Sequence, residues 1–144
     1  MTVEENLRVI ERYLEAFTMQ EADRLAGFYT ESSIYQGPGL PEPLRGPSAI
    51  IENFRGFWSA FPDLRFEKER AFGQGDWVCV EGTGTGTHKG PLTSPDGETI
   101  PATNKKMQIK LCTVYKVVAG KVMEDHDYFD QLGFMAQLGL APEG

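Results

Sequence analysis

The chain has 144 residues, 40% hydrophobic and 24% charged, an ordinary globular balance that predicts one domain over residues 1–144. Its net charge of −7 at pH 7 disfavours binding to phosphate backbones, so we expect no nucleic-acid partner. The sequence holds no run of the roughly 20 apolar residues that a membrane span needs. The acidic N-terminus also lacks the basic start of a secretory signal. We therefore expect a cytoplasmic protein without a membrane partner.

The first half of the chain predicts three helices. Apolar residues recur at helical spacing within residues 5–17, and a second short helix is expected over 21–29. The third helix is expected from Pro47, which suits a first helical turn, to about Phe61. A short strand near 33–36 precedes a loop whose prolines exclude a helix or a central strand.

After residue 63 the apolar period changes from 3.6 to 2, which predicts strands. The expected strands are residues 64–72, 76–88, 106–118 and 121–129. Residues 90–104, which include a Pro95-Asp96-Gly97 turn signal, are expected to form a loop, and the tail 130–140 a short helix or cap. Gly82, Gly84 and Gly86 alternate with threonine, which indicates strong curvature or close backbone approach. The fold class is therefore α+β, with helices covering the concave face of a curved sheet and a ligand cavity between the layers.

The last hairpin carries the acidic residues of most interest. If Ala119-Gly120 is a two-residue turn, Val118 pairs with Lys121, and Asp127 lies opposite Cys112. Met123 and Phe129 would share that face, so burial should raise the pKa of Asp127 toward a value that suits a general acid or base. Asp125 would be a like-charged neighbour on the same face. The alternative is that these acids are ordinary solvated charges.

The remaining candidates are weaker. Cys79 and Cys112 lie in alternating apolar runs and are expected to be buried free thiols, and no spacing of cysteine or histidine predicts a metal site. Tyr35 and Trp58 are expected in the cavity wall, since each combines an apolar body with a hydrogen-bond donor. The predicted substrate-binding set is Tyr35, Trp58, Phe54, Cys112, Met123 and Phe129.

Several segments resemble the SnoaL-like polyketide cyclases, also called ester cyclases, of the NTF2-like superfamily. The strand that ends in Thr87-His88-Lys89-Gly90 resembles the GTHxG motif of that family. Gly120–Gly133 resembles its terminal hairpin, Phe61-Pro62-Asp63 the end of its third helix, and Gln137-Leu138-Gly139 its closing motif. The resemblance covers nearly the whole chain and implies a conical α+β barrel, a homodimer or homotetramer, a small-molecule substrate and no cofactor.

The resemblance also implies chemistry. An aspartate on the last long strand would serve as the general acid/base of an intramolecular aldol-type ring closure, and Asp127 occupies the matching position. Asp125 and Asp130 lie close enough in the sequence to be alternatives, while His88 or Tyr35 would hydrogen-bond the enolate. The rival hypotheses are another activity of this fold (isomerase, hydrolase or hydroxylase) and a non-catalytic binding module. Such a module would use an outward hairpin face that holds Tyr115, Val117, Val122 and Tyr128.

Overall fold

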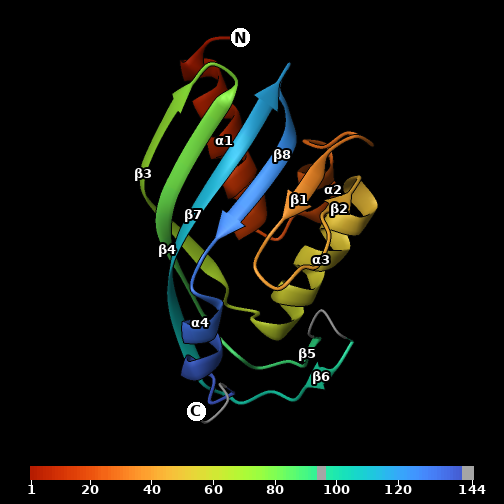
Figure 1. The fold of residues 1–144 in the computed structure, drawn as a ribbon, viewed down its shortest axis with the longest axis vertical. Helices are drawn as coiled ribbons and strands as arrows, with labels where there is room; N and C mark the ends of the chain where they lie inside the picture. Colours follow the sequence, from red (N-terminus) through yellow and green to blue (C-terminus); the bar gives the residue numbers. More distant parts are fainter. Residues whose placement is uncertain (94–96, 141–144) are drawn as a thin grey trace.

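The structure, a computed structural model, describes residues 1–93 and 97–140. Its main sheet is curved and has six strands in the order β2-β1-β8-β7-β4-β3 (Figure 1). Strand β1 runs parallel to β8, and the other pairings in this sheet are antiparallel. The strands are β1 (Ile34–Gln36), β2 (Leu44–Arg45), β3 (Arg65–Gln74), β4 (Trp77–Thr87), β5 (Leu92–Thr93), β6 (Thr99–Ile100), β7 (Lys106–Val118) and β8 (Lys121–Tyr128).

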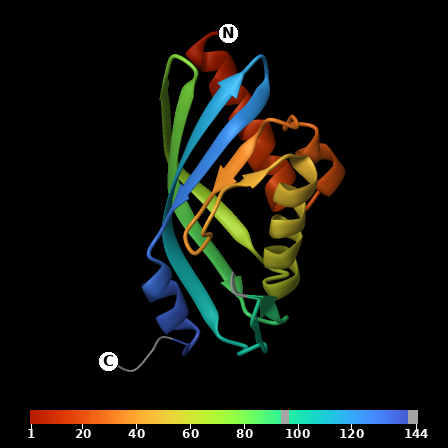
Figure 2. The same ribbon diagram turned by 45° about the vertical axis from the view of Figure 1, so that its right-hand side comes forward.

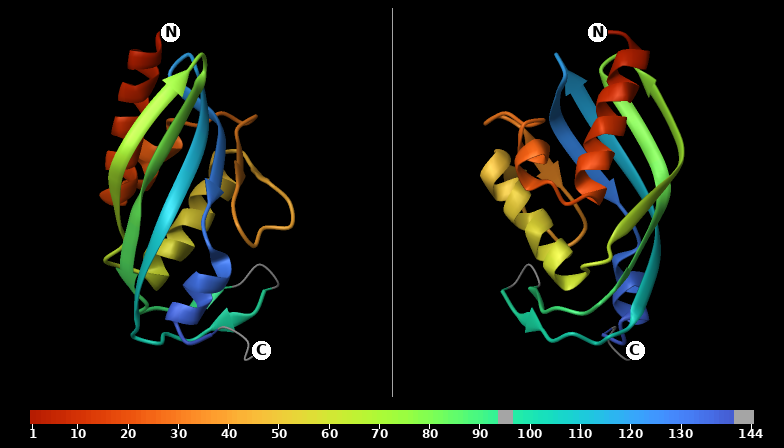
Figure 3. Two further views of the ribbon diagram at one scale, coloured as in Figure 1. Left: turned by 60° about the vertical axis from the view of Figure 1, so that its left-hand side comes forward. Right: turned by 180° about the vertical axis from the view of Figure 1, so that it is seen from behind.

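Helices cover the hollow side of this sheet. The described helices are α1 (Val3–Thr18), α2 (Ala22–Ala26), α3 (Pro47–Ala60) and α4 (Gln131–Gln137). Helix α1 packs on β3 and β4, while α3 lies across the open side of the curve and α4 packs against β7 (Figures 2 and 3). None of the helices in the described part of the chain is long and apolar enough to cross a bilayer. The predicted α+β architecture is confirmed.

Local sequence signals explain where the helices begin. The hydroxyl of Thr2 accepts a hydrogen bond from the backbone N–H of Glu5, which caps α1. Pro47 occupies the first turn of α3, where its missing N–H costs no hydrogen bond. Residues 90–104 differ from the prediction, since they contain the short strands β5 and β6 rather than only a loop. Of the turn signal at 95–97, Pro95 and Asp96 lie outside the described residues.

The hairpin between β7 and β8 starts in the predicted register and then departs from it. Ala119 and Gly120 both have positive φ, as a tight two-residue turn requires, and Val118 pairs with Lys121. A β-bulge then inserts Met123 as an extra residue, so Lys116 pairs with Glu124.

The bulge shifts every later pair by one residue. Asp127 therefore lies opposite Thr113, and the predicted pairing with Cys112 is wrong. The predicted outward face is wrong for the same reason, because Tyr115, Val117 and Val122 are buried while Tyr128 is exposed.

The glycines of β4 create space on the inner face of the sheet. An added Cβ at Gly82 would lie 2.7 Å from Cζ of Phe66 and closer still to the carbonyl oxygen of Glu67. At Gly86 it would lie 3.2 Å from the ring of Phe61. The predicted close approach is thus present, because aromatic side chains occupy the volume that larger residues on β4 would take.

Candidate active site

A cavity of about 110 Å³ lies between the inner face of the sheet and the helices α1 and α3. Most of its wall is aromatic or aliphatic, with Phe54 and Phe57 from α3 and Leu111 from β7 among the apolar residues. The acidic residues in its wall are Asp125 and Asp127, and the basic one is Arg65 at the start of β3. This mostly apolar lining lowers the local dielectric around the acids, which strengthens the polar interactions that a ligand would make there.

Asp127 is held by two hydroxyl groups. Tyr35 of β1 donates to its Oδ2 at 2.7 Å, and Thr113 of β7 donates to its Oδ1 at 2.8 Å. Tyr35 and Thr113 are 5% and 3% exposed, so both donors are fixed by packing. Because each carboxylate oxygen accepts one hydrogen bond, Asp127 has a defined orientation at the cavity wall.

Asp125 is more deeply buried than Asp127 and less completely hydrogen-bonded. It is 1% exposed and lies opposite Tyr115 on β7. The hydroxyl of Tyr13 on α1 donates to Oδ2 of Asp125 at 2.8 Å, and Oδ1 has no partner in the described structure. Burial raises the pKa of Asp125 well above its usual range, the charge of Asp127 and a hydrogen bond with the Asp127 side chain raise it further, and the Tyr13 hydrogen bond opposes these effects. We predicted a raised pKa for Asp127 from the sequence, and the structure gives one for Asp125.

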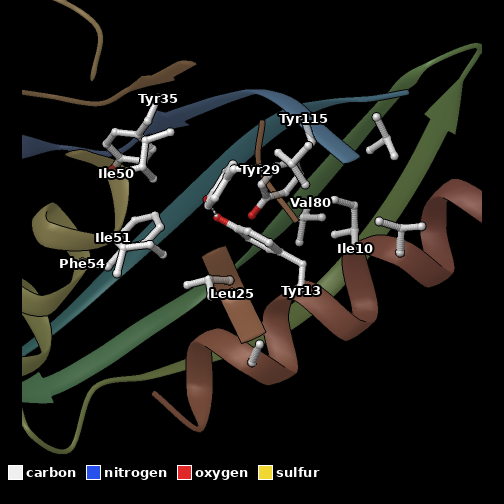
Figure 4. Close-up of a cluster of buried hydrophobic side chains, with 14 of the residues drawn as sticks. Ile10, Tyr13, Leu25, Tyr29, Tyr35, Ile50, Ile51, Phe54, Val80 and Tyr115 are labelled. Atoms are coloured by element: carbon white, nitrogen blue, oxygen red, sulfur yellow. Dashed lines mark hydrogen bonds between the residues drawn. The ribbon is translucent and has the colours of Figure 1, made fainter. Parts of the chain in front are cut away.

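Tyr13, Tyr29 and Tyr115 form a cluster of buried tyrosines (Figure 4), and Tyr13 connects this cluster to Asp125. The hydroxyls of Tyr13 and Tyr29 are hydrogen-bonded to each other, and the ring of Tyr13 meets that of Tyr115 edge to face. Burial raises the pKa of Tyr13, Tyr29 and Tyr115 well above 10, and Asp125 acts in the same direction whenever it is ionised. These phenols are therefore neutral donors at any ordinary pH.

The predicted substrate-binding residues fall into two groups. Tyr35, Phe54 and Phe129 line the cavity. Trp58 is buried against Phe54 but is not among the lining residues.

The other two predicted binding residues lie away from the cavity. Cys112 lies on the opposite face of β7, where its Sγ is 3.6 Å from Sγ of Cys79. Both thiols are free as predicted, but they are half-buried rather than buried. Met123 occupies the bulge, and its sulfur accepts a hydrogen bond from the hydroxyl of Thr30 at 3.7 Å. The shifted register explains why neither side chain reaches the cavity.

His88 also lies outside the set of cavity-lining residues. Its ring is fully buried, stacks on Phe61 with ring centroids 5.3 Å apart, and contacts the hydroxyl of Thr103 at 3.0 Å through Nδ1. Burial lowers the pKa of His88 below its usual value. These contacts join α3 to the segment that precedes β7.

Asp130 has a structural task in the described fold. Its side chain accepts a hydrogen bond from the backbone N–H of Gly133 at 2.8 Å and thereby caps α4. It is exposed, so of the three neighbouring acids only Asp125 and Asp127 face the cavity. The part of the chain that the structure describes contains no cluster of three or more His, Cys, Asp or Glu side chains suited to a metal ion.

Sequence reasoning missed Thr113, Tyr13, Tyr29 and Tyr115 as site residues. The alternation of β7 already gave Thr113 and Tyr115 a common face, but the unbulged register placed that face outward. Tyr13 falls on the buried stripe of α1 with Val9 and Ala16, which gave no sign of a polar role.

Comparison with known proteins gives consistent results over the full length of the fold. The family model for the SnoaL-like polyketide cyclases matches residues 7–138. The chain is 29% identical to the aklanonic acid methyl ester cyclases DauD of Streptomyces sp. (strain C5) and DnrD of Streptomyces peucetius. Each match covers 94% of this chain, with 84% of DauD and 94% of DnrD.

Among solved structures, AclR from Streptomyces galilaeus superposes with a TM-score of 0.82 at 19% identity, over 98% of this chain and 100% of AclR. That likeness shows the shared NTF2-like fold. Because the family model spans the helices, the curved sheet and both cavity-facing acids, this chain belongs to the SnoaL-like polyketide cyclase family.

Proposed function

We propose that this protein catalyses an intramolecular aldol-type ring closure of a small, mostly apolar carbonyl compound, with Asp127 as the acid/base and no cofactor. The observation that carries the proposal is the position of Asp127. Its carboxylate lies in the wall of an apolar cavity, and each of its oxygens accepts one hydrogen bond from a buried hydroxyl. A general base needs this fixed position next to the carbon whose proton it removes.

The reaction suits the cavity that surrounds this base. Asp127 would remove a proton from a carbon next to a carbonyl group, and the enolate would attack a second carbonyl of the same molecule. The apolar wall would hold the chain folded, so that the two reacting carbons meet without a bimolecular encounter. General acid/base assistance contributes roughly 10²–10⁴-fold, which is useful for a ring closure that folding of the substrate already favours.

Tyr35 is the better placed of the two donors that the sequence offered for the enolate. It lines the cavity and is 5% exposed, whereas His88 is not among the lining residues. Burial raises the pKa of Tyr35 well above 10, so its phenol stays protonated. Its hydrogen is donated to Asp127 in the resting protein and would turn to the enolate once Asp127 has taken up the substrate proton. This supports Tyr35 beside Asp127, with His88 holding the neighbouring chain segments together.

The curated relatives suggest the substrate class. Both are named as cyclases of aklanonic acid methyl ester, and their similarity covers nearly all of this chain. We therefore propose a polyketide-derived substrate that carries an ester or a similarly uncharged carbonyl group.

The test is turnover of aklanonic acid methyl ester and related keto-esters by the purified protein. An aldol closure leaves the mass unchanged, replaces a ketone with an alcohol and forms a new carbon–carbon bond, all of which mass spectrometry and NMR detect. Ester hydrolysis would release the alcohol and leave a carboxylic acid of lower mass, and hydroxylation would add the mass of an oxygen atom. Binding without any chemical change across the panel would favour a non-catalytic module.

The variant Asp127→Asn should lose at least about 100-fold in kcat, as expected when a general base is removed. Glu124→Gln is the matched control, because Glu124 lies on the same strand and pairs with His126 away from the cavity. Full activity in Asp127→Asn would overturn the assignment.

The homodimer or homotetramer and the cytoplasmic location that the resemblance and the composition suggest stay predictions. Light scattering during size-exclusion chromatography measures the oligomeric state.

A further inference from the structure

The two acids of the cavity differ in how their oxygens are satisfied. They occupy successive inward positions of β8, two residues apart. Asp127 accepts hydrogen bonds on both oxygens, from Tyr35 and Thr113. Asp125 accepts one bond on Oδ2, and its Oδ1 is buried without a partner in the described structure. A buried oxygen without a donor suits a protonated carboxyl, which carries its own hydrogen.

The groups around Asp125 can stabilise a negative charge on only one of the two acids. They are Tyr13 from α1, Tyr115 from β7, the Tyr29 that follows α2, and Asp127 on its own strand. All three phenols are neutral. The basic residue in the cavity wall, Arg65, is exposed, and within residues 1–93 and 97–140 it forms no hydrogen bond or ion pair with either acid. Two carboxylates without a cation in such surroundings are strongly disfavoured, so one of the pair holds a proton.

The tyrosine hydrogen bonds fix the position of the Asp125 carboxyl. The hydroxyl of Tyr13 lies 2.8 Å from Oδ2 of Asp125 and is in turn hydrogen-bonded to the hydroxyl of Tyr29. This chain of two buried phenols holds Asp125 in one orientation beside Asp127.

We propose that Asp125, a residue of the cavity wall, is kept neutral and acts as the general acid of the reaction, donating its carboxyl hydrogen to the carbonyl oxygen that the enolate attacks, while Asp127 acts as the base. Tyr13 and Tyr29 are positioning residues that orient Asp125. The inference rests on the proposed function and deepens it, because it assigns the roles of general base and general acid to two different carboxyl groups instead of one.

The proton balance of this division closes without a cofactor. Asp127 takes the proton from the substrate carbon, and the electron pair of that C–H bond forms the new carbon–carbon bond. The carbonyl π electrons move to oxygen, which receives the proton of Asp125. Asp127 is then protonated and Asp125 ionised, and transfer of one proton from Asp127 to Asp125 restores the starting state.

The first test reads the protonation states without any substrate. In protein labelled with ¹³C-aspartate, the carboxyl carbon of Asp125 should report a protonated group at pH 7. In Asp127→Asn its titration should move to lower pH, because the neighbouring charge is gone. In Tyr13→Phe it should move to higher pH, because the bond that favours the ionised form is gone. An ionised Asp125 at pH 7 in the wild-type protein overturns the inference.

The second test measures turnover of a substrate that the wild-type protein converts and that Asp127→Asn no longer converts. Asp125→Asn keeps the shape of the side chain but cannot transfer a proton, so kcat should fall about 10²–10⁴-fold with little change in KM. In Tyr13→Phe, the loss of activity that the wild-type protein shows at high pH should move to higher pH, since this limb of the pH profile reports loss of the proton from Asp125. Heteronuclear NMR spectra establish that both variants fold.

The two proposals fail in different ways. Unchanged turnover in Asp125→Asn, together with lost turnover in Asp127→Asn, overturns the acid role of Asp125 and leaves the cyclase proposal standing. Full turnover in Asp127→Asn overturns the proposed function itself.

Discussion

The hydroxyl of Tyr35 lies 2.7 Å from Oδ2 of Asp127, and this bond joins β1 to the acid of the neighbouring strand β8. Hydrogen bonds to a charged group contribute about 1.5–3 kcal/mol. Tyr35→Phe should therefore lower kcat/KM by roughly 10- to 150-fold on a confirmed substrate. The control is Tyr128→Phe, since Tyr128 is 59% exposed and is not a lining residue. Equal activity of the two variants would contradict an essential Tyr35–Asp127 bond.

The raised pKa of Asp125 predicts how stability depends on pH. An aspartate in the unfolded chain releases its proton near pH 4, whereas folded Asp125 holds it to higher pH. Between these two values the folded state binds the extra proton, so the free energy of unfolding falls with rising pH by about 1.4 kcal/mol per unit. The contribution is fully present below the unfolded pKa and is lost as pH rises through the folded pKa.

The variant Asp125→Asn isolates this effect, because it removes the titrating group. We expect the variant to gain stability relative to the wild-type protein at pH 8, and the gain to shrink at pH 5. Urea unfolding of both proteins at the two pH values measures this difference, in which the other titrating groups cancel. A constant difference between pH 5 and pH 8 would show that Asp125 does not titrate abnormally.

Gly82 should tolerate no side chain. A Cβ at this position would press on the backbone of Glu67 and on the Phe66 ring, which lines the cavity. Gly82→Ala should destabilise the protein by about 1–3 kcal/mol, as overpacking commonly does. Gly56→Ala is the matched control: it lies inside α3 with open space around it and should stabilise by up to about 1 kcal/mol. Thermal unfolding of both variants compares the signs of the two stability changes. A gain of stability in Gly82→Ala would contradict the close approach of Glu67 and Phe66 to this glycine.

Asp130 should affect stability rather than chemistry. Because its carboxylate caps α4, Asp130→Ala should cost about 1 kcal/mol of unfolding free energy. Asp130→Asn should cost little, since asparagine caps a helix equally well. Chemical denaturation checks both values, and a loss of turnover in Asp130→Asn comparable to that in Asp127→Asn would assign it a catalytic part.

Local patterns in the sequence were sufficient to predict most elements of the fold. Apolar alternation predicted the long strands β7 and β8. Turn residues predicted the Ala119-Gly120 turn, and Pro47 predicted the start of α3. The inward position of Asp125 and Asp127 also followed from strand alternation. The short strands β5 and β6 did not, because two-residue strands depend on partners rather than on their own sequence.

The sequence by itself determined the fold class, the family and the two acids that face the cavity, because period, turn residues and motif order are properties of the chain. Tertiary structure alone decided which side chains meet those acids. One extra residue at Met123 shifts the partner of Asp127 from Cys112 to Thr113, and a bulge of that kind has no distinct sequence signal. The contacts of Asp125 with Tyr13, and of Asp127 with Tyr35, join residues about 90 to 110 positions apart, so only packing of the helices and the edge strand on the sheet brings them together.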